Sequence, residues 1–111
     1  MRTMKAALYQ GDRKLEVKDI PVPEVGPGEA LSRVRAEGVC GSDLLLWWDK
    51  TEPEEIPGGH EVAGEIVEVG EGVDLGRIGD RVAIDTLGFG LNCGICFYCR
   101  QGQPIQCRDN E

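Results

Sequence analysis

Residues 59–73 read Gly-His-Glu-Val-Ala-Gly-Glu-Ile-Val-Glu-Val-Gly-Glu-Gly-Val, and this stretch decides the fold. Its centre, Val62–Val69, is rich in valine and isoleucine, which predicts a strand. Gly70 and Gly72 then close the strand in a turn. His60, the only histidine of the chain, stands where the strand begins. The stretch therefore predicts a sheet strand that carries a potential ligand at its start.

The flanking sequence predicts more strands and one short helix. Ser42–Asp49 is the best helical segment, because Ser42 or Asp43 can cap its N-terminus. Within Ala30–Val39, small and apolar residues alternate with charged ones, as in a sheet with one face in water. The sixteen glycines and six prolines leave little room for long helices, so we expect a mostly β fold. The expected strands besides Val62–Val69 are Met4–Tyr9, Leu15–Ile20, Ala30–Val39 and Arg81–Asp85.

Length and charge exclude several classes of protein. The 111 residues suffice for one domain, and the net charge is -8. An acidic chain of this kind is unsuited to bind nucleic acid or an anionic membrane surface. No apolar run approaches the roughly 20 residues that span a bilayer. The N-terminus leads into a strand without the apolar region of a signal peptide, so we expect a cytoplasmic location.

Four of the five cysteines form a cluster near the C-terminus. Cys93, Cys96, Cys99 and Cys107 are spaced C-x2-C-x2-C-x7-C. In a reducing compartment, clustered cysteines are more often metal ligands than disulfides. Four thiolates suit a structural Zn²⁺, with bonds of about 2.3 Å. Disulfides within the cluster are one alternative. An iron–sulfur cluster is another, although the bacterial ferredoxin run has a last gap of three followed by proline, whereas Arg108 follows here.

Cys40 and His60 can each be explained without a function, as a small buried residue and an ordinary histidine. Considered together, however, both lie at strand–turn junctions flanked by glycine. Catalytic zinc often uses two cysteines and a histidine, with one position left open. Asp43 is a natural acceptor for the imidazole N–H. The metalloprotease motif is excluded, because its second histidine would fall at Gly64.

Three motifs in order resemble the zinc-containing medium-chain alcohol dehydrogenases. Gly59–Gly64 followed by Gly70 resembles the family's zinc signature, G-H-E-x-x-G and then glycine after five residues. Cys40–Asp43 resembles the segment of the first catalytic zinc ligand and the proton-relay hydroxyl. The four-cysteine lobe resembles the structural zinc lobe, and Gly79–Val82 resembles the turn before it. The resemblance spans Met4–Cys107 and is closest to sorbitol, threonine and butanediol dehydrogenases.

The resemblance implies a mostly β, GroES-like, partly open barrel with a zinc-binding cysteine lobe. Residues 1–111 would be the N-terminal segment of that catalytic domain, and residues 88–111 the lobe. The family's dinucleotide-binding domain is expected to be absent from this chain, since the nearest glycine pattern, Gly88–Gly90, lacks the third glycine. The third catalytic zinc ligand would also lie downstream. We expect the lobe to be ordered only with metal bound.

The resemblance also implies roles for individual residues. Cys40 and His60 would bind the catalytic zinc, with Glu61 beside it as an occasional ligand or electrostatic partner. Ser42 would take the proton of the zinc-bound alcohol, and Asp43 would orient His60. Zinc lowers the pKa of a bound alcohol, and a hydride then passes to a nicotinamide. The structural zinc would be held by the lobe cysteines Cys93, Cys96, Cys99 and Cys107.

We expect this chain to be the N-terminal catalytic-domain segment of an oxidoreductase, namely a zinc-dependent, NAD(P)-linked alcohol or polyol dehydrogenase. The isolated chain is expected to be inactive. Expected partners are a small alcohol or polyol, a separate dinucleotide-binding segment, and further copies of the full-length protein. The alternative is a non-enzymatic zinc-binding GroES-like module that acts through a partner chain.

Three features depart from the family pattern. Leu45 replaces a histidine that extends the proton relay in many relatives, so a direct water route or another group would have to serve beyond Ser42. The segment Asp85–Asn92 is a few residues longer than in typical members and would lie near the substrate pocket. Trp47 and Trp48 either line the substrate cleft or pack the short helix against the barrel.

Overall fold

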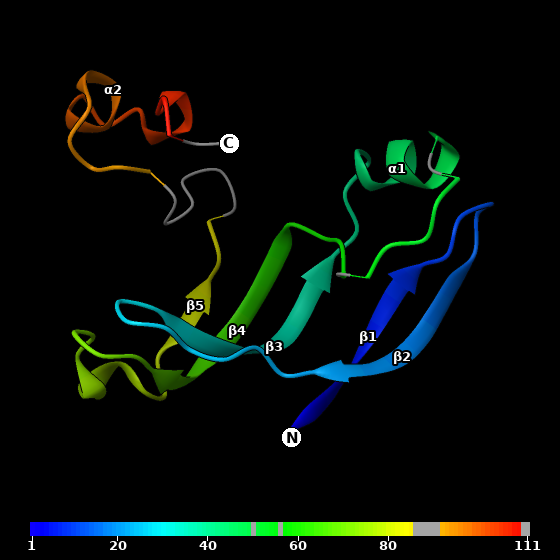
Figure 1. Cartoon of the computed structure of the whole chain (residues 1–111), viewed down its shortest axis with the longest axis horizontal. Helices are drawn as coiled ribbons and strands as arrows, with labels where there is room; N and C mark the ends of the chain where they lie inside the picture. The colour runs from blue at the N-terminus through cyan, green and yellow to red at the C-terminus, as the bar shows by residue number, and fades with distance from the viewer. Residues whose placement is uncertain (50, 56, 86–91, 110–111) are drawn as a thin grey trace.

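The computed structural model describes residues 1–49, 51–55, 57–85 and 92–109, and its regular structure is mostly β. Two antiparallel sheets are formed, one with the order β1-β2 and one with the order β3-β4-β5. Figure 1 shows them side by side, with α1 and the C-terminal segment above opposite ends of the molecule. The elements are β1 (Thr3–Tyr9), β2 (Leu15–Pro21), β3 (Ala30–Gly38), α1 (Asp43–Asp49), β4 (Glu61–Val69), η1 (Leu75–Arg77), β5 (Arg81–Ala83), α2 (Phe97–Arg100) and η2 (Pro104–Gln106).

The five predicted strands and the predicted helix are all confirmed, most of them within one residue at either end. The last strand is shorter than predicted, since β5 ends at Ala83 and not at Asp85. Three short helical turns, η1, α2 and η2, were not predicted. The last two lie among the cysteines, where hydrophobic periodicity carries no signal. None of the helices in the described ranges is long and apolar enough to cross a membrane.

The register of β3 and β4 determines which residues meet. The pairing runs from Ala30 opposite Val69 to Gly38 opposite Glu61, with a bulge between Val34 and Ala36. The end of β3 and the start of β4 therefore share one edge of the sheet, which brings the residues just beyond each strand together. The two strands approach so closely at Gly64 that a Cβ there would collide with the backbone carbonyl of Arg33.

Little of the chain is buried. The buried apolar residues in the described structure are Ala6, Leu8, Tyr9, Ile66 and Cys107. The expectation that β3 buries one face is wrong: Val34 is 55% exposed, and charged residues on the other face are exposed as well. A register shift between Val34 and Ala36 interrupts the side-chain alternation at this point.

Candidate metal centres

The first cluster of potential ligands consists of Cys40, His60 and Glu61, here called the edge site. Cys40 follows β3 by two residues, and His60 immediately precedes β4. Because Gly38 pairs with Glu61, these residues meet although they are far apart in sequence. One ligand atom from each of the three lies within 4.8 Å of the others. A side chain at position 38 would collide with the Glu61 side chain, so glycine leaves room for that carboxylate.

Asp43 fixes the backbone of Cys40 in two ways. The Cys40 N–H donates to Asp43 Oδ2 at 2.7 Å, and the Asp43 N–H donates to the Cys40 carbonyl at 3.1 Å. The same turn continues into α1, where the Leu44 and Leu45 N–H groups donate to the carbonyls of Gly41 and Ser42. Cys40 is thus held against the first residue of the helix.

His60 lies between Asp43 and Ser42. Asp43 Oδ1 is 3.3 Å from His60 Nδ1, and Ser42 Oγ is 3.4 Å from His60 Nε2. With the ring proton on Nδ1, facing the carboxylate, Nε2 keeps its lone pair. This nitrogen is then available to accept the Ser42 hydroxyl or to bind a metal ion.

Hydrogen bonds within the edge site shift the pKa values of Cys40 and His60 in opposite directions. Hydrogen bonding by the Ser42 side chain and backbone, and then by His60, lowers the pKa of the Cys40 thiol. The hydrogen bond with Cys40, assisted by the nearby charge of Asp43, raises the pKa of His60. Both directions favour a thiolate beside a protonated ring; thiolate is the form of cysteine that binds metals, and the ring gives up a proton when it binds one. The donor set of thiol, imidazole and carboxylate therefore fits Zn²⁺.

The second cluster, here called the cysteine lobe, comprises Cys93, Cys96, Cys99 and Cys107. Their four sulfur atoms lie within 4.8 Å of one another. All five cysteines lie in the described ranges and all are free, so the structure contains none of the disulfides weighed as an alternative. Four sulfurs at this spacing fit a tetrahedral Zn²⁺, whose bonds of about 2.3 Å place its ligands about 3.8 Å apart.

Backbone N–H groups surround these sulfurs. Cys107 Sγ accepts from the N–H groups of Cys93 and Asp109, at 3.3 and 3.4 Å. Cys96 Sγ accepts from the Cys99 N–H at 3.5 Å and thereby caps the α2 turn. That bond is the main reason why the pKa of Cys96 falls to about 6, whereas desolvation beside the other thiols raises the pKa of Cys99 to about 12. A bound cation would remove this conflict, because it stabilises all four thiolates.

The sequence model of the family described as the alcohol dehydrogenase GroES-like domain matches residues 26–111, which include both clusters. The chain belongs to this family. The predicted family and its GroES-like fold are confirmed. Membership explains why a strand-edge cluster and a four-cysteine lobe occur together in one mostly β chain.

Named relatives of this GroES-like chain are dehydrogenases. It is 37% identical to the sorbitol dehydrogenase of Bacillus subtilis over 97% of its own length and 31% of the relative. It is 45% identical to the L-threonine 3-dehydrogenase of Sinorhizobium medicae, over 86% of the chain and 28% of that protein. The structure of an alcohol dehydrogenase from Escherichia coli CFT073, complexed with NADH, superposes with a TM-score of 0.77 at 36% identity. The match covers 95% of this chain and 30% of that protein. The chain thus spans about a third of these proteins.

The remaining sequence expectations have mixed outcomes. The packing interpretation holds for Trp47, whose ring lies 6.0 Å from that of Tyr9. Trp48 is 57% exposed, and Leu45 is 63% exposed. The long segment before the lobe and its glycine pattern fall largely on residues 86–91, outside the described residues. Sequence reasoning missed the contacts between Tyr9 and α1, because nothing in a strand residue indicates a distant helix as its partner.

Proposed function

We propose that this chain forms the metal-holding part of the active site of a zinc-dependent, NAD(P)-linked alcohol or polyol dehydrogenase. The edge site carries this proposal, because a thiol, an imidazole and a carboxylate gather within 4.8 Å beside a hydroxyl. The relatives named above support the substrate class, since sorbitol and L-threonine are both small hydroxylated molecules. The NADH in the Escherichia coli structure supports a nicotinamide as hydride acceptor.

The residues of the edge site have separate roles in the proposed reaction. Zinc held by Cys40, His60 and, in some states, Glu61 would supply Lewis acidity toward a substrate hydroxyl. Ser42 Oγ receives the proton that the hydroxyl gives up. The Asp43 carboxylate, 3.3 Å from His60 Nδ1, would keep the ring proton on that nitrogen and leave Nε2 as the nitrogen that would bind the metal.

Beyond Ser42 the proton leaves through water. The next side chain that could have served, Leu45, has no titratable group and is exposed. A hydroxyl that exchanges its proton directly with solvent needs no further relay residue. The structural zinc is assigned by this proposal to the cysteine lobe, where it would hold the segment in place without touching the substrate.

The test is metal content together with turnover in the native protein that contains this sequence. We expect two zinc ions per chain and alcohol-dependent reduction of NAD or NADP across a panel of secondary alcohols and polyols. Cys40→Ser should remove one zinc and abolish turnover, while Cys107→Ser removes the other zinc. A single zinc that is indifferent to Cys40→Ser would contradict the proposal and favour the non-enzymatic module.

A further inference from the structure

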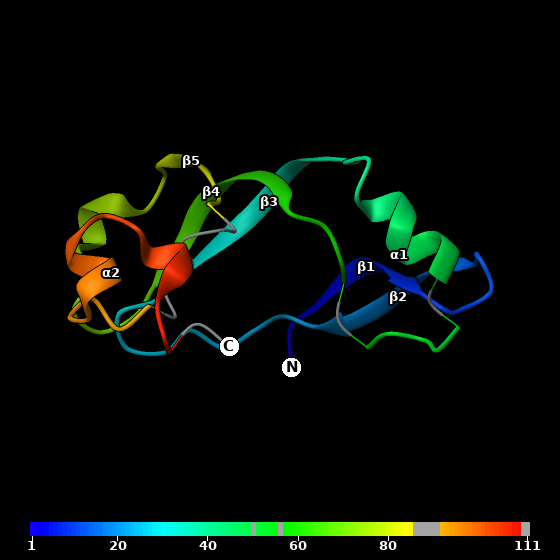
Figure 2. The ribbon, with the colours of Figure 1, turned by 90° about the horizontal axis from the view of Figure 1, so that it is seen from above.

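The β1–β2 hairpin reaches α1 through one buried side chain. Tyr9, at the end of β1, is 8% exposed. Its hydroxyl donates to the Trp47 carbonyl at 2.9 Å, and its ring lies against the Trp47 ring with an interplanar angle of 56°. The Tyr9 carbonyl accepts from the Glu54 N–H at 2.8 Å, in the segment that follows the helix. Figure 2 shows α1 lying over the hairpin.

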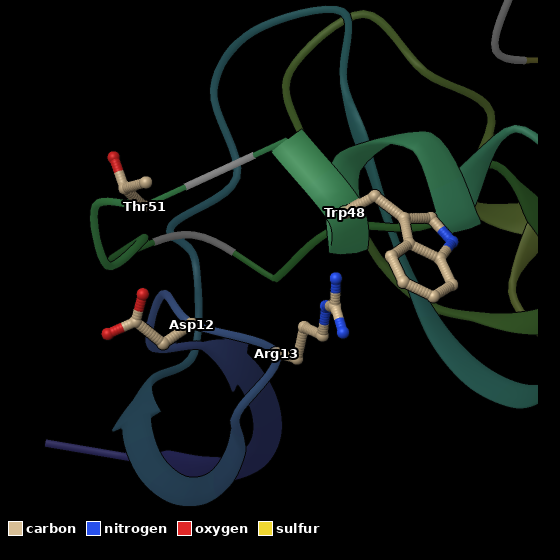
Figure 3. A pocket seen from close by; sticks show the side chains of 4 residues that line it. All are labelled: Asp12, Arg13, Trp48 and Thr51. Atoms are coloured by element: carbon tan, nitrogen blue, oxygen red, sulfur yellow. The ribbon is translucent and has the colours of Figure 1, made fainter.

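The hairpin turn makes a second contact with the helix. Gly11, Asp12 and Arg13 all have positive φ, at 79°, 48° and 60°. This conformation costs free energy at the two residues that are not glycine. It brings the Arg13 N–H to 3.3 Å from the Tyr9 hydroxyl, and the Arg13 guanidinium carbon to 4.0 Å from the Trp48 ring centroid. Figure 3 shows Arg13 extending from the turn toward Trp48.

The turn also packs against the segment beyond the helix. A Cβ at Gly11 would collide with the Thr51 carbonyl, so this position accepts only glycine without displacement. Asp12, Arg13, Trp48 and Thr51 line an open hollow of about 350 Å³ between the turn and the helix end. The strained turn is therefore held by contacts on both of its sides, which is how such conformations persist.

The opposite end of the same helix begins at the edge site. Asp43 is the first residue of α1 and contacts both Cys40 and His60. A helix of seven residues is only about 10 Å long, so the two ends move together. Helices this short are not stable by themselves in water and take their position from tertiary contacts. At the C-terminal end of α1, Trp47 is contacted by Tyr9 and Trp48 by Arg13, both from the hairpin.

We infer that Tyr9 and Arg13 are positioning residues for the edge site: by holding the C-terminal end of α1, they fix Asp43 and Cys40 relative to His60. This inference rests on the proposed function, because it assigns the edge site a bound metal. None of the contacts described above joins Tyr9 or Arg13 directly to a ligand of the edge site. Their effect passes through the backbone of the helix and through the paired hydrogen bonds between Asp43 and Cys40.

The test uses the native protein with Co²⁺ in place of zinc, since cobalt bound to thiolate has visible absorption that reports ligand geometry. Tyr9→Phe keeps the ring and removes only the hydroxyl. Arg13→Gln removes the guanidinium from the Trp48 ring. For each we expect the cobalt dissociation constant of the edge site to rise about tenfold, as when a ligand loses its outer support. The edge-site absorption should shift, and the lobe spectrum should stay unchanged.

Matched controls separate positioning from general stability. Tyr98→Phe removes a tyrosine hydroxyl from α2, in the cysteine lobe, and Arg2→Gln breaks an exposed ion pair with Glu68. Both should leave the edge-site spectrum and affinity unchanged. Arg13→Lys, which keeps a cation over the indole, should restore most of the affinity lost in Arg13→Gln.

The outcomes are distinct. If Tyr9→Phe and Arg13→Gln lower the unfolding temperature but leave edge-site affinity and absorption intact, the inference is overturned. If Tyr9→Phe does not fold, the Arg13→Gln variant tests the inference by itself, because Arg13 is exposed and its substitution leaves the buried tyrosine in place. If the unaltered protein binds cobalt only in the lobe, the proposed function has failed before either variant is made.

Discussion

The edge site and the cysteine lobe gather ligands in different ways. The ligands of the lobe lie within fifteen consecutive residues, Cys93–Cys107, and meet through short turns. Cys40 and His60 lie on either side of a helix and meet because β3 pairs with β4. The cysteine lobe thus depends on the local spacing of its ligands, and the edge site depends on the pairing of two strands. We expect the lobe to need a bound metal ion in order to fold. At the edge site, we expect the ion to bind ligands that the sheet has already brought together. The predictions below test this difference, from the largest effect to the smallest.

Removal of metal should unfold the lobe and spare the sheet. Structural zinc sites contribute about 10–16 kcal/mol of binding free energy to folding. After chelation, we expect amide protection to disappear over residues 92–109 while β3 and β4 keep theirs. Hydrogen exchange followed by mass spectrometry measures both in one sample. Lobe protection that survives chelation would contradict the prediction.

Ser42→Ala should remove proton transfer without removing metal. General acid–base groups contribute roughly 10²–10⁴-fold to rate, so kcat in the native protein should fall by that factor. Zinc content should stay at two per chain. Ser32→Ala is the matched control, because the buried Ser32 hydroxyl has no hydrogen-bond partner in the described structure. Its loss should leave both kcat and stability intact. Equal losses in the two variants would remove Ser42 from the relay.

Asp43→Asn should weaken metal binding at the edge site alone. The amide still accepts from the Cys40 N–H, but it brings no charge to His60. Partners of this kind are worth roughly 10–100-fold in metal affinity. Competition with a chromophoric chelator measures the loss. Asp80→Asn, which breaks an ion pair with Arg77, is the control and should change nothing. An unchanged edge-site affinity would show that Asp43 does not support His60.

Gly64→Ala should damage the edge site from within the sheet. The new methyl group would collide with the Arg33 carbonyl, and overpacking of this kind costs about 1–3 kcal/mol. As β3 and β4 separate, edge-site affinity should fall although no ligand has changed. Gly58→Ala, which meets open space, should be neutral. Urea unfolding and metal titration give the two readouts. If the Gly64→Ala protein is as stable as the unaltered protein and binds metal with normal affinity, the close approach of β3 and β4 does not control the edge site.

The sequence predicts the strands and both clusters for different reasons. Val62–Val69 is recognisable because β-branched residues are bounded by glycines, and the lobe because its spacing is local. For Cys40 and His60, the sequence shows only that both are potential ligands at glycine-flanked strand–turn junctions; their joint role is implied by family resemblance, since the β3–β4 register that joins them is a long-range property.

Other features could not be predicted from pattern. One is the register shift between Val34 and Ala36, beside the exposed Val34, because a bulge depends on how two strands pair and cannot be read from the sequence of one strand. The α2 turn is capped by the Cys96 sulfur, a role that capping rules assign to oxygen. The docking of Tyr9 on Trp47 joins residues 38 positions apart, beyond the reach of any local signal.

The pairing of Gly38 with Glu61 has a consequence in terms of chain entropy. Bringing the two ends of a flexible segment together has an entropic cost that grows slowly with its length. For residues 41–59 this cost is met when the sheet forms, before any ion arrives. An ion that joins Cys40 to His60 therefore closes no new loop, and the entropic cost of loop closure does not reduce its affinity. In the lobe, we expect the ion itself to close the chain between Cys93 and Cys107. The two sites could thus hold the same element and still release it at very different concentrations of a competing chelator.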